Sequence, residues 1–181
     1  MKQINTYINE KLRLTTKQKY TCQPKDKYEL KKIIIDRIKE DGNECDLNDI
    51  DTSKIIDMSL LFDADGNEIF KEFNGDISQW DVSNVKNMYA MFYRCEKFNC
   101  DISKWNVSNV RDMGSMFSEC EQFNSDISHW NISNVKNMTY MFWGCKKFNQ
   151  NLDSWDVSNV TTMYKTFLNC PTQPTWYDED K

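Results

Sequence analysis

Apolar residues recur in this chain with a period of 25 residues. The stretch "DISQWDVSNVKNMYAMF", which begins at Asp76, returns as "DISKWNVSNVRDMGSMF", "DISHWNISNVKNMTYMF" and "NLDSWDVSNVTTMYKTF". An older copy upstream, "CDLNDIDTSKIIDMSLLF", has five extra residues before Phe73. A fixed period of about 20 to 50 residues is typical of units that stack on one another, so the pattern predicts a solenoid of about five units.

The apolar positions inside one unit predict a short helix. Met88, Met91, Phe92 and Cys95 fall at i, i+3, i+4 and i+7, which is one face of an α-helix. The residue before them is Asn, Asp or Thr in every copy, and these residues cap helix N-termini. The stretch "FNCDISKW" fits a short strand that would pair with its equivalents in a narrow parallel sheet. The predicted fold is an α/β repeat solenoid with one short parallel strand and one short helix per unit.

The segment before the repeats predicts a helical cap. Asp26 is an N-cap with Glu29 three residues later, and Gly42 is a stop signal. The apolar face of this helix consists of Leu30, Ile33, Ile34 and Ile38. A weaker helix is outlined by Ile4, Ile8 and Leu12. Because a terminal repeat exposes the apolar face that a neighbour would cover, these helices are expected to lid the stack.

The chain is therefore expected to have four parts. A helical cap spans residues 1–44, and a degenerate first repeat spans 45–74. Four repeats of 25 residues follow over 75–174, and a tail covers 175–181. Trp176 is expected to close the last unit.

Composition and charge narrow the class of function. The chain has 181 residues, 39% hydrophobic and 13% aromatic, which suffices for one packed domain. Residues 1–44 carry 11 Lys/Arg against 7 Asp/Glu, whereas the rest carries 12 against 21. The repeats are acidic, so a nucleic-acid partner is not expected, because phosphate binding needs a basic surface. No run approaches the roughly 18 apolar residues of a membrane span, and the first residues lack a signal-peptide pattern.

The seven cysteines favour a reducing compartment. An odd number of cysteines cannot pair fully within one chain, and free thiols persist in the cytoplasm. The predicted location is therefore the cytoplasm. The cell surface is the alternative if a leader was removed. Four of the cysteines recur on the predicted inward face, where buried reduced thiols are expected rather than disulfides or zinc ligands. These four are Cys95, Cys120, Cys145 and Cys170. Cys22 and Cys100 lie outside this row and are expected to be more exposed.

Two rows of acidic or amide residues begin at Asp76 and Asp81. Carboxylates at such spacing occur in calcium-binding solenoids, but the glycine-rich loops of those sites are missing here. Local turns, in which each side chain accepts a backbone N–H, are the favoured interpretation. His129 is the single histidine and has no paired nucleophile or carboxylate. No catalytic residue, metal or cofactor is predicted, and the protein is not expected to be an enzyme.

Function is expected where the repeat varies. At the outward positions of the predicted helix the copies read Tyr-Ala-Tyr-Arg, Gly-Ser-Ser-Glu, Thr-Tyr-Trp-Gly and Tyr-Lys-Leu-Asn. Exposed Tyr, Trp and Arg are typical anchors of protein interfaces. The candidate partner-binding residues are Tyr89, Tyr93, Arg94, Tyr140, Trp143 and Tyr164, with Lys104 and His129 from a second variable row. Ordinary solvated faces are the alternative interpretation of both rows.

The unit "W-D-V-S-N-V-x-x-M-x-x-M-F-x-x-C-x-x-F-N" resembles the repeat of the BspA-like leucine-rich repeat surface proteins of bacteria and some protozoa. The resemblance covers roughly residues 45–170, and about a dozen positions repeat in register. In the first full unit it is carried by Trp80, Asp81, Val82, Ser83, Asn84, Val85, Met88, Met91, Phe92, Cys95, Phe98 and Asn99. The resemblance implies a right-handed, leucine-rich-repeat-like solenoid that binds without catalysis, typically in adhesion to host proteins or other cells.

Two functions stay open at this point. One is a cytoplasmic protein–protein interaction module, for example an inhibitor or adaptor from a bacterium or a mobile element. The other is the adhesin or host-binding role that the resemblance implies. In both hypotheses the partner is a protein, and the chain is expected to be a monomer.

Overall fold

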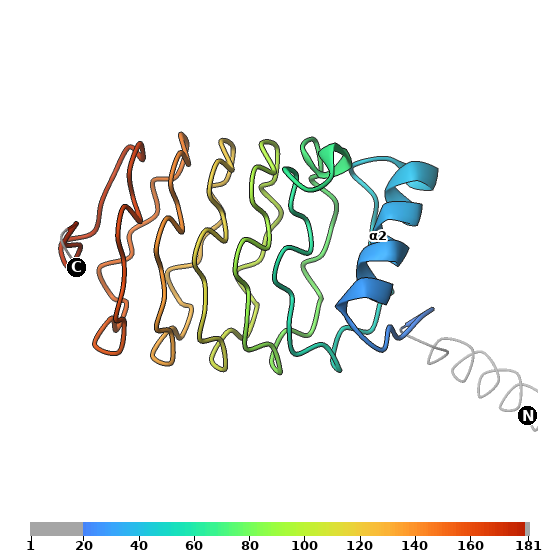
Figure 1. The fold of residues 1–181 in the computed structure, drawn as a ribbon, viewed down its shortest axis with the longest axis horizontal. Helices are drawn as coiled ribbons and strands as arrows, with labels where there is room; N and C mark the ends of the chain where they lie inside the picture. Colours follow the sequence, from blue (N-terminus) through green and yellow to red (C-terminus); the bar gives the residue numbers. More distant parts are fainter. Residues whose placement is uncertain (1–19, 180–181) are drawn as a thin grey trace, which may run out of the picture.

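The computed structural model describes residues 20–179, which form a stack of coils with a helix across one end (Figure 1). This helix is α2 (Lys27–Asp41), and a single 3₁₀ turn, η1 (Glu68–Phe70), lies in the first coil. The described residues hold no extended strand, and successive coils meet at isolated parallel β-bridges instead. One row of bridges runs through Asp57, Asn87, Asp112, Asn137 and Thr162.

The predicted helix in each repeat is wrong. In an α-helix each N–H bonds to the carbonyl four residues earlier. Here every second N–H of the segment leaves its own coil: those of residues 88, 90, 92 and 94 donate to the carbonyls of residues 112, 114, 116 and 118 at 2.8–2.9 Å. The N–H groups between them close tight turns, as from Met91 to the Met88 carbonyl (3.2 Å). The segment is a run of turns bonded to the next coil.

These turns require backbone conformations that a helix excludes. Ala90 and Arg94 have φ of 52° and 61°. The left-handed region costs a non-glycine residue roughly 1–2 kcal/mol. The same two positions have positive φ in the later coils, at Ser115, Glu119, Tyr140, Gly144, Lys165 and Asn169. Because the conformation recurs in every coil, it belongs to the stacking geometry and does not mark one particular site.

The predicted buried face is nevertheless the face that the structure buries. The side chains of Met88, Met91, Phe92 and Cys95 have no solvent exposure. Tight turns, like helical turns, bring residues three and four positions apart to the same side. The apolar spacing is therefore compatible with both, and only the destination of the backbone N–H groups distinguishes them.

The predicted strand is wrong as well, and with it the α/β leucine-rich-repeat-like solenoid. Where a sheet was expected, a row of asparagine side chains links the coils. The Asn99 N–H donates to Oδ1 of Asn74 (2.8 Å), the Asn124 N–H to Asn99 (2.7 Å) and the Asn149 N–H to Asn124 (3.0 Å). A side-chain acceptor occupies the place of a strand carbonyl, so no continuous ladder forms.

Stacked aromatic rings fill the core. The rings of Phe92, Phe117, Phe142 and Phe167 form a column with centroid separations of 5.6, 5.8 and 5.3 Å. Trp80, Trp105, Trp130 and Trp155 lie beside it, and each donates its Nε1 proton to a carbonyl of the preceding coil. Trp176 makes the same bond at 2.7 Å and stacks on the Trp155 ring at 6.4 Å. It therefore closes the last coil as predicted.

The cysteine row is reduced, and its inner members are buried as predicted. All seven cysteines are free. The thiols of Cys95, Cys120 and Cys145 each donate to a phenylalanine carbonyl of the preceding coil at 2.9–3.0 Å. Cys170, which was predicted to be buried with them, is half-buried, as are Cys22 and Cys100.

Local turns engage the acidic and amide rows. Oδ1 of Asp81 accepts the Ser83 N–H at 3.0 Å, and Oδ1 of Asn106, one coil later, accepts the Ser108 N–H at 3.2 Å. Asp76 makes the equivalent turn in the other row. Because a carboxylate and an amide oxygen accept this N–H equally well, Asp and Asn exchange freely between copies.

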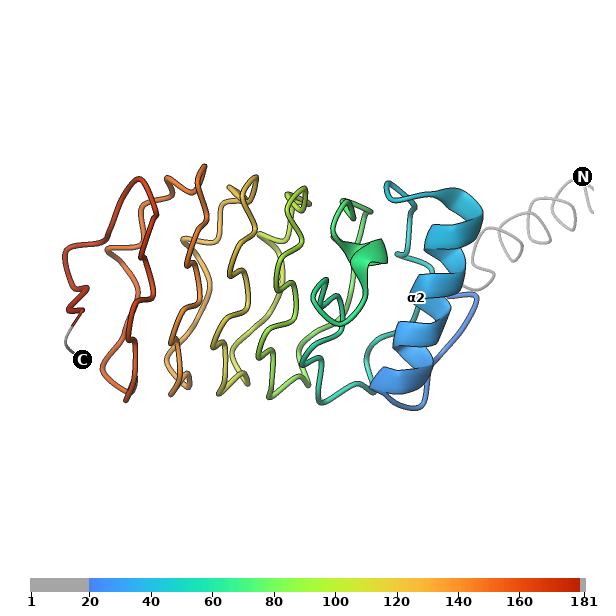
Figure 2. The same ribbon diagram turned by 45° about the horizontal axis from the view of Figure 1, so that its top comes forward.

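The helix α2 covers the first coil (Figure 2). Asp26 accepts the N–H groups of residues 28 and 29, and Gly42 ends the helix with φ of 87°. Leu30, Ile34 and Ile38 are buried against the stack. The weaker helix predicted around Ile4, Ile8 and Leu12 lies outside the described residues. Among the described residues, no helix has the length and apolar character needed to cross a bilayer.

Candidate functional site: an aromatic groove

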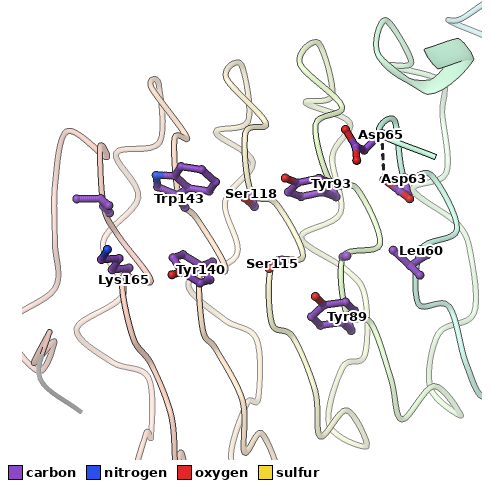
Figure 3. Close-up of a pocket in the computed structure, with 12 residues that line it drawn as sticks. Leu60, Asp63, Asp65, Tyr89, Tyr93, Ser115, Ser118, Tyr140, Trp143 and Lys165 are labelled. Carbon is purple, nitrogen blue, oxygen red and sulfur yellow. Dashed lines mark hydrogen bonds between the residues drawn. The ribbon is translucent and has the colours of Figure 1, made fainter. Parts of the chain in front are cut away.

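The outward positions of successive coils meet at a hollow that crosses the stack (Figure 3). Its volume is about 510 Å³. We call it the aromatic groove. It is lined by Leu60, Asp63, Asp65, Tyr89, Ala90, Tyr93, Ser115, Ser118, Tyr140, Trp143, Lys165 and Leu168. Five coils contribute to it, so the groove runs along the stack and not along a single repeat.

The groove exists because the middle coil carries small residues. Ser115 and Ser118 lie between Tyr89 and Tyr93 on one side and the next aromatic pair, Tyr140 and Trp143, on the other (Figure 3). The aromatic rings rise from the flanking coils as two ridges, and the serine side chains leave a notch between them. A serine has only one heavy atom beyond Cβ, so its side chain leaves this space open. The backbone hydrogen bonds between the coils continue beneath the notch.

Gly114, in the same coil as the two serines, occupies a position where a side chain would clash. A Cβ atom at this position would lie 2.5 Å from Nδ2 of Asn137. That amide is held in place by its bond to Oδ1 of Asp112 (2.9 Å). The equivalent positions in the neighbouring coils carry Tyr89 and Thr139. A side chain at residue 114 would therefore have to displace the Asn137 amide.

One end of the groove is acidic. Asp63 and Asp65 lie there, and Asp65 pairs with Arg94 at 2.6 Å. The Asp65 N–H donates to Oδ1 of Asp63 at 3.0 Å, which fixes the two carboxylates side by side. The hydrogen bond that Arg94 donates to Asp65 raises the pKa of the Arg94 guanidinium. Burial, and then the charge of Asp65, raise the pKa of the Tyr93 hydroxyl, which therefore stays protonated at neutral pH.

The other end is aromatic and basic. The Tyr140 and Trp143 rings are 5.8 Å apart, and the Tyr164 ring meets Tyr140 edge-on at 5.7 Å. Nζ of Lys165 lies 4.9 Å from the centre of the Tyr164 ring. Opposite charges at the two ends give the groove a direction along the stack.

Two polar atoms of the groove are buried without a hydrogen-bond partner in the described part of the chain. They are Oγ of Ser118 and Nε1 of Trp143. An unpaired buried donor costs about 1–3 kcal/mol. Such atoms are uncommon in folded proteins, and both belong to residues of this one hollow.

Exposed apolar side chains gather around the groove. Leu60 and Tyr89 line it and are 42% and 43% exposed, and Tyr164 beside Tyr140 is 45% exposed. A second hollow of about 260 Å³ shares Leu60 and Asp63 and continues to Tyr28 of α2, which is 75% exposed. Four of the five exposed large hydrophobic residues described therefore lie on or next to this face; the fifth is Ile56.

The structure brings together most of the residues that the sequence singled out. Tyr89, Tyr93, Tyr140 and Trp143 line the groove, and Tyr164 and Arg94 border it through the contacts described above. Lys104 and His129 lie elsewhere. Lys104 lines a polar hollow of about 320 Å³ with Asp76 and Asp101, and His129 is exposed.

The floor and the acidic end were not predicted from the sequence. Ser115 and Ser118 are not interface anchors by residue type, although a small residue between large ones is itself the signal of a notch. Leu60 and Asp63 occupy the same two positions in the degenerate first copy, so an alignment of that copy could have found them. Tyr28 lies outside the repeat, and nothing in the sequence connects it to this face.

The comparisons with known proteins point to one family. The family model that matches is described as "Mycoplasma protein of unknown function, DUF285", and it matches residues 65–176. This range contains four of the five coils that line the groove. No curated protein and no solved structure gives a significant match.

Proposed function

The chain belongs to the DUF285 family, and we propose that it is a non-catalytic module that binds a protein partner through the aromatic groove. The observation that carries this proposal is the concentration of exposed aromatic side chains on one face. Tyr89 and Tyr164 are each more than 40% exposed. Their rings sit at positions that the stack leaves free, because the backbone of each coil bonds to its neighbours whatever the outward side chain is.

The chemistry of the groove favours protein recognition. Tyr and Trp supply large apolar contact area at a small cost in side-chain entropy, and they dominate the energetics of protein interfaces. Clustered exposed apolar residues on a soluble surface typically mark an interaction site. The carboxylates of Asp63 and Asp65 at one end add polar groups that would give such an interface its specificity.

A cytoplasmic location is part of this proposal. Seven free cysteines support it, since free thiols persist in reducing compartments. The resemblance of the repeat to BspA-like surface proteins supports the alternative, in which the same groove binds a host protein or another cell. Labelling intact cells with a membrane-impermeant amine reagent separates the two. Labelling before lysis supports the surface role, and labelling only after lysis supports the cytoplasmic one.

Affinity capture with matched variants tests the proposal. The tagged wild-type protein, a groove variant (Tyr93→Ala with Trp143→Ala) and a control variant (Lys104→Ala with His129→Ala) are used to capture proteins from cells of the source organism. The control changes two exposed side chains far from the groove. We expect a partner that wild type and control retain and the groove variant loses at least tenfold. A partner retained equally by all three would contradict binding through the groove.

A further inference from the structure

We propose that the aromatic groove binds a proline-rich segment of the partner in the polyproline II conformation, lying along the stack with a basic residue beside Asp63 and Asp65. This inference rests on the proposed function and names the chemistry of the partner. Its first support is a match of periods. Neighbouring coils are joined by backbone N–H···O bonds of 2.6–3.0 Å around the groove. Parallel chains joined in this way lie about 4.8 Å apart.

The repeat of the groove follows from that spacing. The Tyr89/Tyr93 ridge and the Tyr140/Trp143 ridge are two coils apart, which is about 9.6 Å. Polyproline II rises about 3.1 Å per residue with three residues per turn, so side chains return to the same face every 9.3 Å or so. In an extended strand they return after about 6.6 Å. The polyproline II period fits the ridges, and the period of a strand does not.

Because of this match, every third residue of the bound segment would meet the groove at one of three positions. One residue enters the notch over Ser115 and Ser118, between the two ridges. Its neighbours three positions before and after it reach the coils of Asp63 and Lys165, each two coils away.

The unpartnered polar atoms provide an independent second support. Polyproline II has no internal hydrogen bonds, so all its carbonyls are free to accept. The groove holds a buried indole N–H at Trp143 and a buried hydroxyl at Ser118, both without a partner in the described residues. Trp143 is half-buried as a residue, and a ligand carbonyl that contacts its indole N–H would supply the missing acceptor. Aromatic-lined grooves with such donors are a general solution for binding proline-rich segments.

Charge gives the segment its direction. Asp63 and Asp65 line one end of the groove, where Arg94 pairs with Asp65 and the charge of Lys31 acts on Asp63, and Lys165 lines the other end. A lysine or arginine of the ligand finds carboxylate acceptors at the Asp63 end and a like charge, that of Lys165, at the other. Such a charge selects one of the two directions in which a polyproline II helix can lie.

Binding of synthetic peptides tests the inference. The probe is a fluorescein-labelled peptide of sequence RPPLPPLPP, in which leucine recurs at every third residue. Two controls have the same arginine and leucines: RPLPPPLPP changes the spacing, and RGGLGGLGG keeps the spacing without the proline backbone. Fluorescence anisotropy with the full chain should give a Kd for the probe at least tenfold lower than for either control.

Variants of the groove locate the binding. Trp143→Phe keeps the ring and removes the N–H, and should raise the Kd about three- to tenfold, the value of one hydrogen bond. Ser118→Trp fills the notch and should abolish binding. Asp63→Asn with Asp65→Asn should weaken the probe and leave a peptide with glutamine in place of arginine unchanged. Lys104→Ala, away from the groove, should leave every Kd unchanged, and thermal unfolding of each variant confirms that it is folded.

The failure of this inference can be distinguished from the failure of the proposed function. If the captured partner depends on Tyr93 and Trp143 while the probe binds no better than its controls, the proline-rich segment is refuted and the protein-binding function stands. Tighter binding of RGGLGGLGG, or of oligosaccharides on a glycan array, would also overturn it. If the probe binds and Ser118→Trp has no effect, the groove is not the site and the inference fails.

Discussion

Replacement of Phe117 by leucine tests whether stacked rings, beyond simple apolar burial, hold the coils together. Phe117 has no solvent exposure and lies in the middle of the phenylalanine column. Its ring centre is 5.6 Å from Phe92, 3.9 Å from Phe123 and 5.8 Å from Phe142, and each pair is stacked within 12° of parallel. Leucine keeps the site apolar and removes these three ring pairs, together with the wider pairs with Phe98 (6.5 Å) and Trp130 (6.3 Å).

The size of the effect follows from these contacts. An aromatic pair in good geometry contributes about 0.5–1.5 kcal/mol beyond its buried area, so three pairs contribute about 1.5–4.5 kcal/mol. The smaller side chain adds a cavity cost of about 24 cal/mol for each Å³ that stays empty. The free energy of unfolding should therefore fall by at least about 1.5 kcal/mol, out of the 5–15 kcal/mol typical of a domain.

Urea denaturation followed by tryptophan fluorescence measures this change. Trp130 is a suitable reporter because its ring centre lies 6.3 Å from that of Phe117. The matched control is Ile56→Ala, which shortens a side chain that is 59% exposed and should change stability by no more than about 0.5 kcal/mol. If Phe117→Leu also stays within that limit with an unchanged denaturant slope, ring stacking contributes nothing beyond burial and the reasoning is refuted.

Four further predictions concern two of the thiols, one turn and the last coil. Burial raises the pKa of the Cys120 thiol well above its ordinary value of 9.0, so the folded protein keeps this proton at a pH where the unfolded chain has lost it. The stability that this thiol contributes should therefore be complete below pH 9 and decrease as the pH rises above 9. In urea titrations at several pH values, a Cys120→Ala variant should show a smaller decrease than the wild type. Burial likewise raises the pKa of Cys100 to about 11, so at pH 8 only about one thiol in a thousand is ionised, and iodoacetamide should modify Cys100 far more slowly in the folded protein than in urea, as read by mass spectrometry. Asn131→Ala removes the acceptor of the Ser133 N–H (3.1 Å) and should cost about 0.5–1.5 kcal/mol in thermal unfolding, whereas Asn131→Asp should be nearly neutral. Trp176→Ala should speed hydrogen exchange in the last coil alone, because each coil contacts only its neighbours; exchange that increases equally in all coils would contradict this.

The sequence predicted which side chains face inward because burial and local capping depend on residue type. Phe92 and Cys95 are buried, and α2 ends at Gly42, because burial and helix termination depend on the type of the individual residue. The backbone path of the repeat does not depend on residue type in this way. It depends on whether the Met88 N–H bonds within its own coil or to the Asp112 carbonyl of the next, and apolar spacing does not tell these apart.

The groove, too, could be predicted from the sequence only in part. Tyr93 and Trp143 could be proposed from the sequence because aromatic residues at variable positions are unusual. Their alignment along the stack follows from the repeat, whereas the notch between the two aromatic pairs depends on how far the rings rise above Ser115 and Ser118. The acidic end comes from the irregular first copy, in which Asp63 takes the position of Tyr93 and Asp65 lies in the part that contains the five additional residues.

The backbone hydrogen bonds of the stack do not depend on the outward side chains that line the groove, and this leads to a last prediction. In the third coil the outward residues are Ser115 and Ser118, and the next coil carries Tyr140 and Trp143 at the same positions. Ser115 and Tyr140 share a positive φ, 55° and 57°, so a tyrosine fits the backbone of Ser115 without new strain.

The double variant Ser115→Tyr with Ser118→Trp should therefore fold with a stability within about 1 kcal/mol of wild type while the notch is filled. Circular dichroism and thermal unfolding measure the first effect, and loss of the captured partner measures the second. If the variant instead unfolds, the two serines are part of the scaffold, and the fourth coil tolerates its aromatic pair only through contacts that the third coil lacks. If it folds and still binds, the notch is not where the partner enters. Only a variant that is stable and no longer binds agrees with a stack whose backbone hydrogen bonds carry the fold and whose outward side chains carry the function.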